Sequence, residues 1–110
     1  MKIEKNTEIV LKELKYSLAK EYGENINSVI LFGSRAKGLG NDNSDYDIVV
    51  VLKNDYDWKY EKQLSKTVYK FELEKGILTD IHLISVNQIN NTLKGKDPLF
   101  VNAIKNGIYA

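Results

Sequence analysis

Two aspartates one residue apart, Asp45 and Asp47, precede an apolar run from Ile48 to Leu52. In a β-strand, residues i and i+2 project from the same face, so the two carboxylates would converge on one small volume. Two carboxylates this close repel each other, and each resists ionisation beside the other. A divalent cation would remove the conflict, and Mg²⁺ binds a few carboxylates together with water and substrate phosphates. The spacing therefore predicts a metal-binding pair at the start of a strand.

A glycine-serine turn, Gly33 and Ser34, lies ten residues before this pair of carboxylates. The backbone N–H groups of a glycine turn entering a helix point towards an anion, and a serine hydroxyl adds a further donor. Arg35 and Lys37 place two cationic side chains beside the turn. The turn and the carboxylates together describe a site for a nucleoside triphosphate that is bridged to two aspartates through a metal ion.

Three other phosphate and metal motifs do not fit this stretch. The P-loop pattern GxxxxGK[ST] needs a lysine and a hydroxyl residue after Gly38, where Leu39 and Gly40 stand. An EF-hand loop that begins at Asn43 needs its turn glycine at the position of Ile48. The dinucleotide fingerprint GxGxxG is absent between a strand and a helix.

The elements before and after this site follow from the spacing of the apolar residues. An amphipathic helix is predicted from the N-terminus to about Gly23, and residues 28–33 are predicted as a short strand. The unbroken apolar run in residues 45–52 predicts a strand buried on both faces. A second long helix is predicted within residues 57–76. The apolar faces of the two helices are Ile3, Thr7, Val10, Leu11, Leu14 and Leu18 in the first, and Tyr60, Leu64, Val68 and Phe71 in the second.

The last third of the chain predicts one more strand and two short helices. Residues 77–85 form the strand, with Ile81 and Leu83 on one face and Asp80 and His82 on the other. Two short helices are predicted after it. The first begins with Ser85 as its N-cap, and the second with Asp97 as its N-cap and Pro98 at the first helical position. The order α-β-β-α-β-α-α predicts an α/β (α+β) fold with helices packed on a small mixed β-sheet, in one domain over residues 1–110.

The composition excludes several classes of protein. The chain of 110 residues has 43% hydrophobic and 28% charged residues, which is typical of a folded domain with a modest core. Its net charge of +1 gives no overall attraction to nucleic acid or to a membrane surface. Without cysteine, disulfides, thiolate nucleophiles and sulfur-ligated zinc are excluded. No apolar run approaches the roughly 18–20 residues that span a bilayer, and the charged N-terminus is unlike a signal peptide, so we expect a cytoplasmic protein.

The stretch GSRAKG (33–38) followed by SDYD (44–47) has a family resemblance. It resembles the Gly-Ser-(ten residues)-Asp-x-Asp signature of the DNA polymerase beta-like nucleotidyltransferase superfamily. The short chain, with LTDIHLI and the final PLFVNAIKNGIYA, is most similar to the minimal nucleotidyltransferase (MNT) proteins. This resemblance covers nearly the whole chain. It implies a nucleotidyltransferase fold and Mg²⁺-dependent transfer of a nucleoside monophosphate from a triphosphate, most simply AMP from ATP, with release of pyrophosphate.

The same resemblance implies roles for individual residues. Asp45 and Asp47 would hold the metal ions, and Asp80 would be the third carboxylate, near the metal that activates the acceptor hydroxyl. Gly33 and Ser34 would bind the triphosphate. If the two aspartate-bearing strands are neighbours, three carboxylates surround a two-metal centre whose ions lie roughly 3.5–4 Å apart.

Other polar and aromatic residues near the expected site have ordinary structural interpretations beside the functional ones. For Arg35 and Lys37, phosphate contact and simple coverage of the loop surface both remain open. His82 shares a strand face with Asp80 and could be a general base. The metal mechanism needs no histidine, so we favour a packed, hydrogen-bonded role for it. We assign Trp58 and the seven tyrosines to the core and to interfaces, and Asn41-Asp42-Asn43 to a turn.

The acceptor and the partner are expectations from the resemblance alone. Larger relatives carry additional helical domains that hold the acceptor, and MNT proteins do not. The family implies pairing with a HEPN-domain protein in a toxin–antitoxin module. In such a module the MNT protein is an antitoxin that adenylylates a hydroxyl, expected to be that of a tyrosine, on the toxin. One alternative is a non-catalytic subunit that neutralises its partner by contact. Another is transfer to a small-molecule alcohol such as an aminoglycoside, with a homo-oligomer forming the acceptor cleft.

Overall fold

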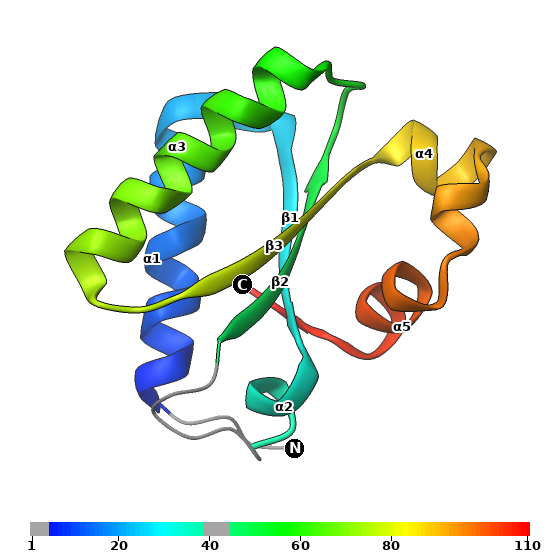
Figure 1. The fold of residues 1–110 in the computed structure, drawn as a ribbon. Helices are drawn as coiled ribbons and strands as arrows, with labels where there is room; N and C mark the ends of the chain where they lie inside the picture. Colours follow the sequence, from blue (N-terminus) through cyan, green and yellow to red (C-terminus); the bar gives the residue numbers. More distant parts are fainter. Residues whose placement is uncertain (1–4, 39–44) are drawn as a thin grey trace.

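The computed structural model describes residues 5–38 and 45–110 of the chain. The predicted turn at residues 41–43 and the helix position Ile3 lie outside this described part. Within it, no helix is both long and apolar enough to cross a membrane. The elements along the chain (Figure 1) are α1 (Lys5–Tyr22), a 3₁₀ turn (Gly23–Asn25), β1 (Ile26–Phe32), α2 (Gly33–Ala36), β2 (Tyr46–Leu52), α3 (Trp58–Lys75), β3 (Thr79–Ser85), α4 (Val86–Asn91), a second 3₁₀ turn (Leu93–Lys96), α5 (Pro98–Asn106) and β4 (Ile108–Tyr109).

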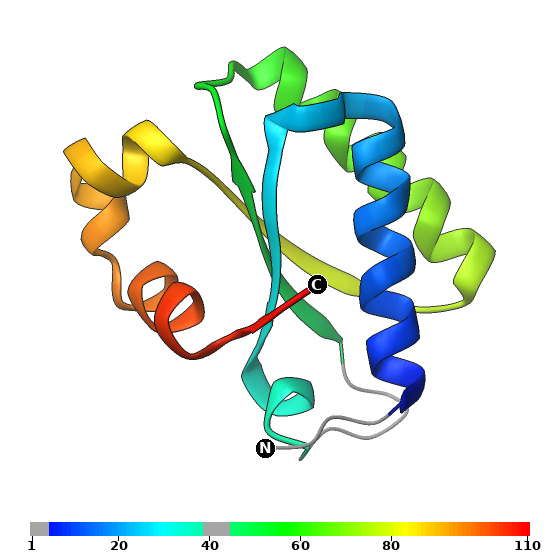
Figure 2. The ribbon, with the colours of Figure 1, turned by 180° about the vertical axis from the view of Figure 1, so that it is seen from behind.

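The sheet is mixed, as the sequence predicted. Its strand order is β3-β2-β1-β4. β1 pairs antiparallel with both β2 and β4, and β2 pairs parallel with β3. A parallel pair needs a long crossover, and α3 is that crossover. The two opposite views in Figures 1 and 2 place α1 and α3 on one face of the sheet and α4 and α5 on the other.

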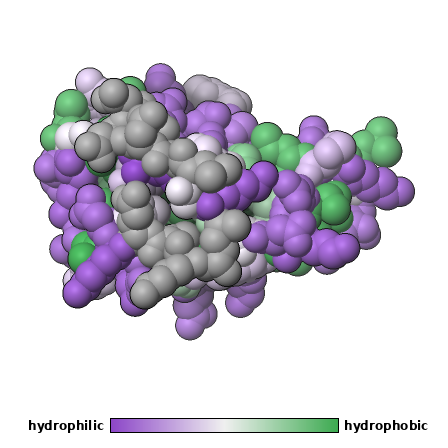
Figure 3. Space-filling view, turned by 90° about the horizontal axis from the view of Figure 1, so that it is seen from below, coloured by the Kyte–Doolittle hydropathy of each residue, from purple (hydrophilic) through white to green (hydrophobic). Residues whose placement is uncertain are grey.

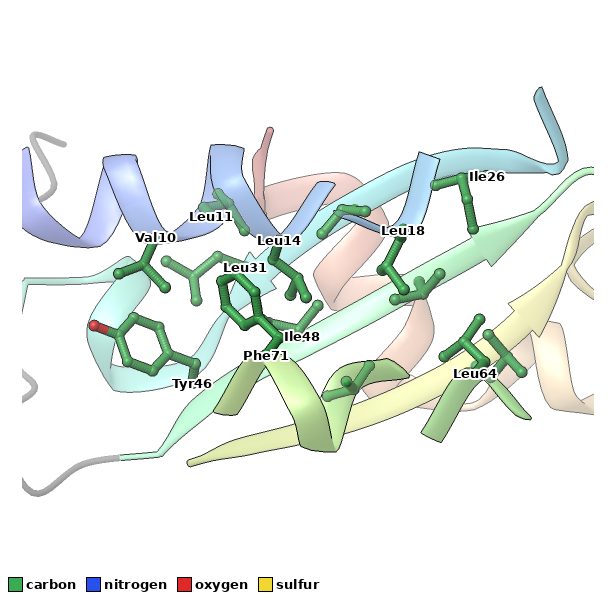
Figure 4. Packing of buried hydrophobic residues seen from close by; sticks show 14 of the residues in the cluster. Val10, Leu11, Leu14, Leu18, Ile26, Leu31, Tyr46, Ile48, Leu64 and Phe71 are labelled. Atoms are coloured by element: carbon green, nitrogen blue, oxygen red, sulfur yellow. The ribbon is translucent and has the colours of Figure 1, made fainter. Parts of the chain in front are cut away.

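The larger part of the core lies between the sheet and the pair α1 and α3 (Figure 4). Five of the six apolar positions predicted for the first helix are buried along α1: Thr7, Val10, Leu11, Leu14 and Leu18. In α3, Leu64, Val68 and Phe71 are buried, and Tyr60 is half-buried. Both helices form where an apolar stripe with a period of 3.6 residues is removed from water.

The opposite face of the sheet has a smaller core under α5. It consists of Ile30, Val49, Val51, Ile84, Phe100 and Ala103. Residues of β2 belong to both clusters, so the prediction of a strand buried on both faces is confirmed. This central strand is therefore packed on both faces, and Asp47 near its start is half-buried.

The predicted helix ends are confirmed by their caps. The Asp57 carboxylate accepts from the Tyr60 N–H at 2.9 Å at the start of α3, and Gly76 ends that helix with a φ of 67°. Ser85 and Gln88 form a reciprocal capping box at α4. Asp97 accepts from the Leu99 N–H, with Pro98 in the first helical turn of α5.

Other expectations need correction. The first predicted strand begins two residues earlier than expected, at Ile26, and the third begins at Thr79 instead of residue 77. The element order had neither α2 nor β4, because four-residue and two-residue elements are too short to show a periodic pattern. Of Trp58 and the seven tyrosines, which we assigned to the core and to interfaces, four are exposed and so lie outside the core: Tyr16, Trp58, Tyr69 and Tyr109.

Candidate active site

Asp47 and Asp80 lie side by side near the starts of two neighbouring strands. The parallel register of β2 and β3 pairs Asp47 with Asp80, and the antiparallel register of β1 and β2 pairs Phe32 with Asp47. Residues opposite each other on adjacent strands project from the same face of the sheet. The expected adjacency of the two aspartate-bearing strands is thus confirmed, while the catalytic roles of the aspartates stay predictions.

The charge of Asp47 is disfavoured by its surroundings. Partial burial raises the pKa of Asp47 above its ordinary value of 3.8, and the carboxylate of Asp80 raises this pKa further. The charge of His82 acts in the opposite direction, and Asp45, which is exposed directly before β2, adds a smaller increase to the pKa of Asp47. The electrostatic conflict expected between neighbouring carboxylates is present, and in it the contribution of Asp80 exceeds that of Asp45.

His82 lies one residue pair further along the same face. Its Nε2 is 3.2 Å from Oδ2 of Asp80. The imidazole ring contacts the ring of Phe32, with centroids 5.7 Å apart, and the ring of Phe100, with centroids 6.4 Å apart. This is the packed, hydrogen-bonded placement that we favoured for His82, and it fixes one side of the Asp80 carboxylate.

Gly33 brings the glycine-serine turn against Asp47. Its φ of 78° is in the left-handed region, which residues with a side chain rarely adopt. A Cβ atom at this position would overlap the Asp47 carboxylate. Glycine is therefore required twice over, for its backbone conformation and for the close approach. The sequence pattern indicates only a phosphate-binding reason for this glycine, because its contact with Asp47 arises from the fold.

Ser34 and the two cationic residues surround the turn at different places. Ser34 is exposed in the first turn of α2, where the first N–H groups of a helix have no partner within the helix. The Arg35 guanidinium lies 4.0 Å from the ring centroid of Tyr46, which belongs to the core under α1 and α3. Lys37 is exposed and lines a cavity beside the turn. Phosphate contact stays a prediction for both cationic side chains.

The carboxylates fit a divalent cation that keeps other ligands. Among the residues that the structure describes, no three side chains of histidine, cysteine, aspartate or glutamate stand together closely enough to enclose a metal ion. What the fold supplies is the adjacent pair Asp47 and Asp80, with Asp45 close enough to act on the pKa of Asp47. All are oxygen donors whose mutual repulsion a cation would relieve, and Mg²⁺ takes few protein ligands when phosphates and water complete its shell.

Two cavities are relevant to the position of the site. One of about 410 Å³ adjoins Gly33 between α2 and α5. A larger one of about 640 Å³ lies between α1 and α3, on the sheet face opposite Asp47, and is lined by side chains such as Lys20, Glu21 and Lys70. The smaller cavity is the one beside the candidate site. Figure 3 views this end of the molecule, where the surface outside the residues drawn in grey is mostly hydrophilic.

Comparisons with known proteins agree with this geometry. Residues 12–108 match the family described as "Polymerase beta, Nucleotidyltransferase". A crystal structure of a "putative nucleotidyltransferase" from Sulfolobus solfataricus superposes with a TM-score of 0.53 and 26% sequence identity, and the match covers 76% of this chain and 71% of that one.

Two similar proteins of Methanocaldococcus jannaschii bear the same kind of name. The "putative protein adenylyltransferase MJ1305" is 33% identical over 98 residues, which are 87% of this chain and 65% of that protein. The "putative protein adenylyltransferase MJ0604" is 40% identical over 53 residues, which are 48% of this chain and 53% of that protein. The chain thus spans between about half and two thirds of the length of these two relatives.

Proposed function

The chain belongs to the polymerase beta nucleotidyltransferase family, and on this premise we propose that it transfers AMP from ATP to a hydroxyl group of a partner protein. The observation that most directly supports the proposal is the pairing of Asp47 with Asp80 across parallel strands, directly beside Gly33. A fold that only needed stability would gain nothing from two carboxylates that raise each other's energy. The names of the relatives support the adenylyl group as the group transferred.

The reaction exchanges one phosphoanhydride bond for one phosphoester bond. The acceptor oxygen attacks the α-phosphorus of ATP and forms the new O–P bond. The bond between the α-phosphorus and the oxygen that leads to the β-phosphate breaks, and pyrophosphate leaves with that electron pair. The hydroxyl proton passes to water. No oxidation or reduction takes place.

The residues of the chain act by binding and orientation. Asp45, Asp47 and Asp80 would hold Mg²⁺, which when bound lowers the pKa of the acceptor hydroxyl and offsets the charge that develops at phosphorus. Gly33 and Ser34 would hold the phosphate chain of ATP through backbone N–H groups and the Ser34 hydroxyl. His82 fixes one side of Asp80 through its 3.2 Å hydrogen bond. Positioning of the reacting groups then provides much of the rate enhancement.

We further propose that the acceptor is a HEPN-domain toxin and that this chain is the antitoxin. The support is the resemblance to MNT proteins, in which a second chain presents the acceptor hydroxyl, expected to belong to a tyrosine. The names of the relatives, as protein adenylyltransferases, are compatible with a protein acceptor.

The test is incubation of the protein with ATP, Mg²⁺ and the product of the neighbouring open reading frame, followed by intact mass spectrometry of both chains. We expect the partner to gain the mass of one AMP group, and Asp47→Asn or Asp80→Asn to abolish the gain. Parallel reactions with GTP, CTP and UTP test the choice of donor. Absence of any modification with all four triphosphates would refute the transferase proposal.

A non-catalytic antitoxin is the second candidate, and the double variant Asp45→Ala with Asp47→Ala separates the two. Under the transferase proposal, this variant loses its ability to suppress the toxin. A protein that acts by contact alone keeps it. Transfer to an aminoglycoside or another small alcohol predicts instead that the added AMP appears on the small molecule when the HEPN-domain protein is left out.

A further inference from the structure

The cavity of about 410 Å³ beside Gly33 has a composition suited to a nucleobase. Its lining residues come from the end of β1, from α2 and from the C-terminal part of the chain: Phe32, Gly33, Ala36, Lys37, Asn102, Asn106, Gly107 and Ile108. We propose that this cavity holds the adenine of the donor nucleotide and that Asn102 and Asn106 recognise its edge. The proposal rests on the proposed function and names the base subsite of the same site.

The position of the cavity matches a nucleotide that is bound at the turn. Gly33 lines the cavity, and the Asp47 carboxylate lies against the same glycine. Phe32 also lines the cavity, while its ring contacts His82, the hydrogen-bond partner of Asp80. Gly33 is thus part of the cavity wall and also lies against the Asp47 carboxylate. A nucleotide whose phosphates bind at this turn would have the cavity on the other side of Gly33.

The inner wall of the cavity is apolar. Phe32, Ala36 and Ile108 are half-buried there, and each belongs to or packs against one of the two core clusters. An aromatic ring and two aliphatic side chains form a surface against which a flat, weakly hydrated base packs more favourably than a phosphate group does. The volume lies within the range of about 300–1,000 Å³ that is usual for small-molecule sites.

The rim on α5 presents amide N–H donors next to a carbonyl acceptor. Asn106 Nδ2 donates to Asn102 Oδ1 at 2.7 Å. This bond leaves both N–H groups of the Asn102 amide as donors and the Asn106 carbonyl oxygen as an acceptor, besides the second N–H group of Asn106.

Adenine has the complementary edge. Its exocyclic amino group is a donor that stands beside a ring nitrogen acceptor, the pattern that asparagine amides recognise in DNA. In the amide orientation of the structure, guanine in the same pose would place its carbonyl oxygen where adenine has the amino group, opposite the Asn106 carbonyl oxygen. This mismatch gives a preference for ATP over GTP. Lys37, at the rim near the turn, places a positive charge towards the phosphate chain.

The test compares the binding of ATP, GTP and inorganic tripolyphosphate by calorimetry, without any acceptor. The variant combines Asn102→Ala with Asn106→Ala. Both side chains are exposed, so we expect the thermal midpoint to stay unchanged. The matched control is Asn91→Ala, because Asn91 Nδ2 donates to Asn87 Oδ1 at 2.8 Å in the same i,i+4 arrangement on α4, away from the cavity.

We expect the double variant to bind ATP about tenfold more weakly, to lose its preference for ATP over GTP and to bind tripolyphosphate as the wild type does. The Asn91→Ala control should bind all three ligands normally. An equal loss for tripolyphosphate would overturn the proposal, because the cavity would then hold phosphates.

Three further results of the same measurements bear on this proposal and on the one it rests on. If the wild-type protein binds tripolyphosphate and binds ATP and GTP equally, the base-subsite proposal is overturned and the transferase proposal stays intact. Wild-type protein that binds none of the three ligands overturns both. Unchanged ATP affinity in the double variant also overturns the base subsite.

Discussion

At the scale of single residues, Asp47 is a carboxylate whose surroundings disfavour its negative charge. It lies in the central strand, between Phe32 and Asp80, where burial and a neighbouring carboxylate both raise its pKa. The residue would be easier to accommodate as an uncharged side chain. Proteins retain such unfavourable groups mostly where function requires them, which is why this residue yields the clearest predictions.

Replacement of Asp47 by asparagine should stabilise the metal-free protein at neutral pH. Because the pKa of Asp47 in the folded state is above the ordinary value of 3.8, the folded protein binds this proton more tightly than the unfolded chain does. The stabilising contribution of the protonated carboxyl is therefore complete below pH 3.8 and is lost as the pH rises through the raised pKa. We expect Asp47→Asn to have a higher thermal midpoint than wild type at pH 7 in a chelating buffer, with no advantage at pH 3.

The control for this prediction is Glu24→Gln, which removes an exposed carboxylate in the first 3₁₀ turn. It should leave the midpoint unchanged at both pH values. A midpoint of Asp47→Asn equal to or below that of wild type at pH 7 would contradict the electrostatic description of the site.

Gly33→Ala should damage the site more than its backbone strain alone explains. An alanine at the φ of 78° costs about 1 kcal/mol, and its Cβ must displace the Asp47 carboxylate. Gly23→Ala is the matched control, because Gly23 has a φ of 61° and no described atom lies within 4 Å of an added Cβ. Both variants should lose about 1 kcal/mol of unfolding free energy in urea titrations, with a further loss in Gly33→Ala only. We expect AMP transfer to persist in Gly23→Ala and to fall at least about tenfold in Gly33→Ala. Equal stability and activity of the two variants would show that the contact with Asp47 is unimportant.

At the scale of elements, local signals predicted what local physics determines. The caps Ser85 and Asp97 were predictable because a side-chain oxygen satisfies a free N–H group two or three residues away. The helix α2 was missed because four residues show no periodic pattern, and the strand β4 because it is held by residues distant in sequence, as in the pairing of Leu31 with Ile108. Of the two neighbouring aspartate pairs, only one could be read from the sequence. The spacing of Asp45 and Asp47 is visible there, but the strand register that sets Asp47 beside Asp80 is not. The cavity between Gly33 and Asn106 has no sequence signal for the same reason.

Ser85→Ala should destabilise the protein through two lost hydrogen bonds. The buried Ser85 Oγ accepts from the Gln88 N–H at 3.1 Å and donates to Asp55 Oδ1 at 2.6 Å. Loss of the cap and of a donor to a carboxylate costs about 1–3 kcal/mol. Ser65→Ala, at an exposed position of α3, should change the unfolding free energy by less than about 0.5 kcal/mol. Urea titrations of the two variants measure the difference.

Asp80 lies at the other end of β3, roughly 17 Å from Ser85 by strand length, so the folded Ser85→Ala variant should keep its AMP transfer. A Ser85→Ala protein as stable as Ser65→Ala would contradict this role of Ser85.

At the scale of the whole molecule, the two faces of the sheet have different tasks. Under α1 and α3 lies the large core, and none of the three aspartates belongs to it, although Ala36 and Ile108 of the base subsite pack against its edge. On the other face, α5 packs over the middle of the sheet at Phe100 and Ala103, while Asp80 at the start of β3 remains exposed. Stability and proposed chemistry can therefore be changed independently.

Leu14→Ala tests this separation. Leu14 is fully buried in α1 (Figure 4), so its truncation leaves a cavity and should cost about 2–5 kcal/mol, against a total of about 5–15 kcal/mol for a domain of this size. The thermal midpoint should fall by roughly 10 °C or more, whereas Leu93→Ala, with Leu93 83% exposed, should leave it almost unchanged.

ATP with Mg²⁺ at 100 times its dissociation constant should raise the unfolding free energy of both variants by about 2.7 kcal/mol, because the ligand binds only the folded state. At a temperature where Leu14→Ala is folded, its rate of AMP transfer should equal that of wild type. A reduced rate in fully folded Leu14→Ala, or a midpoint that ATP and Mg²⁺ do not raise, would show that the core under α1 is coupled to the site across the sheet.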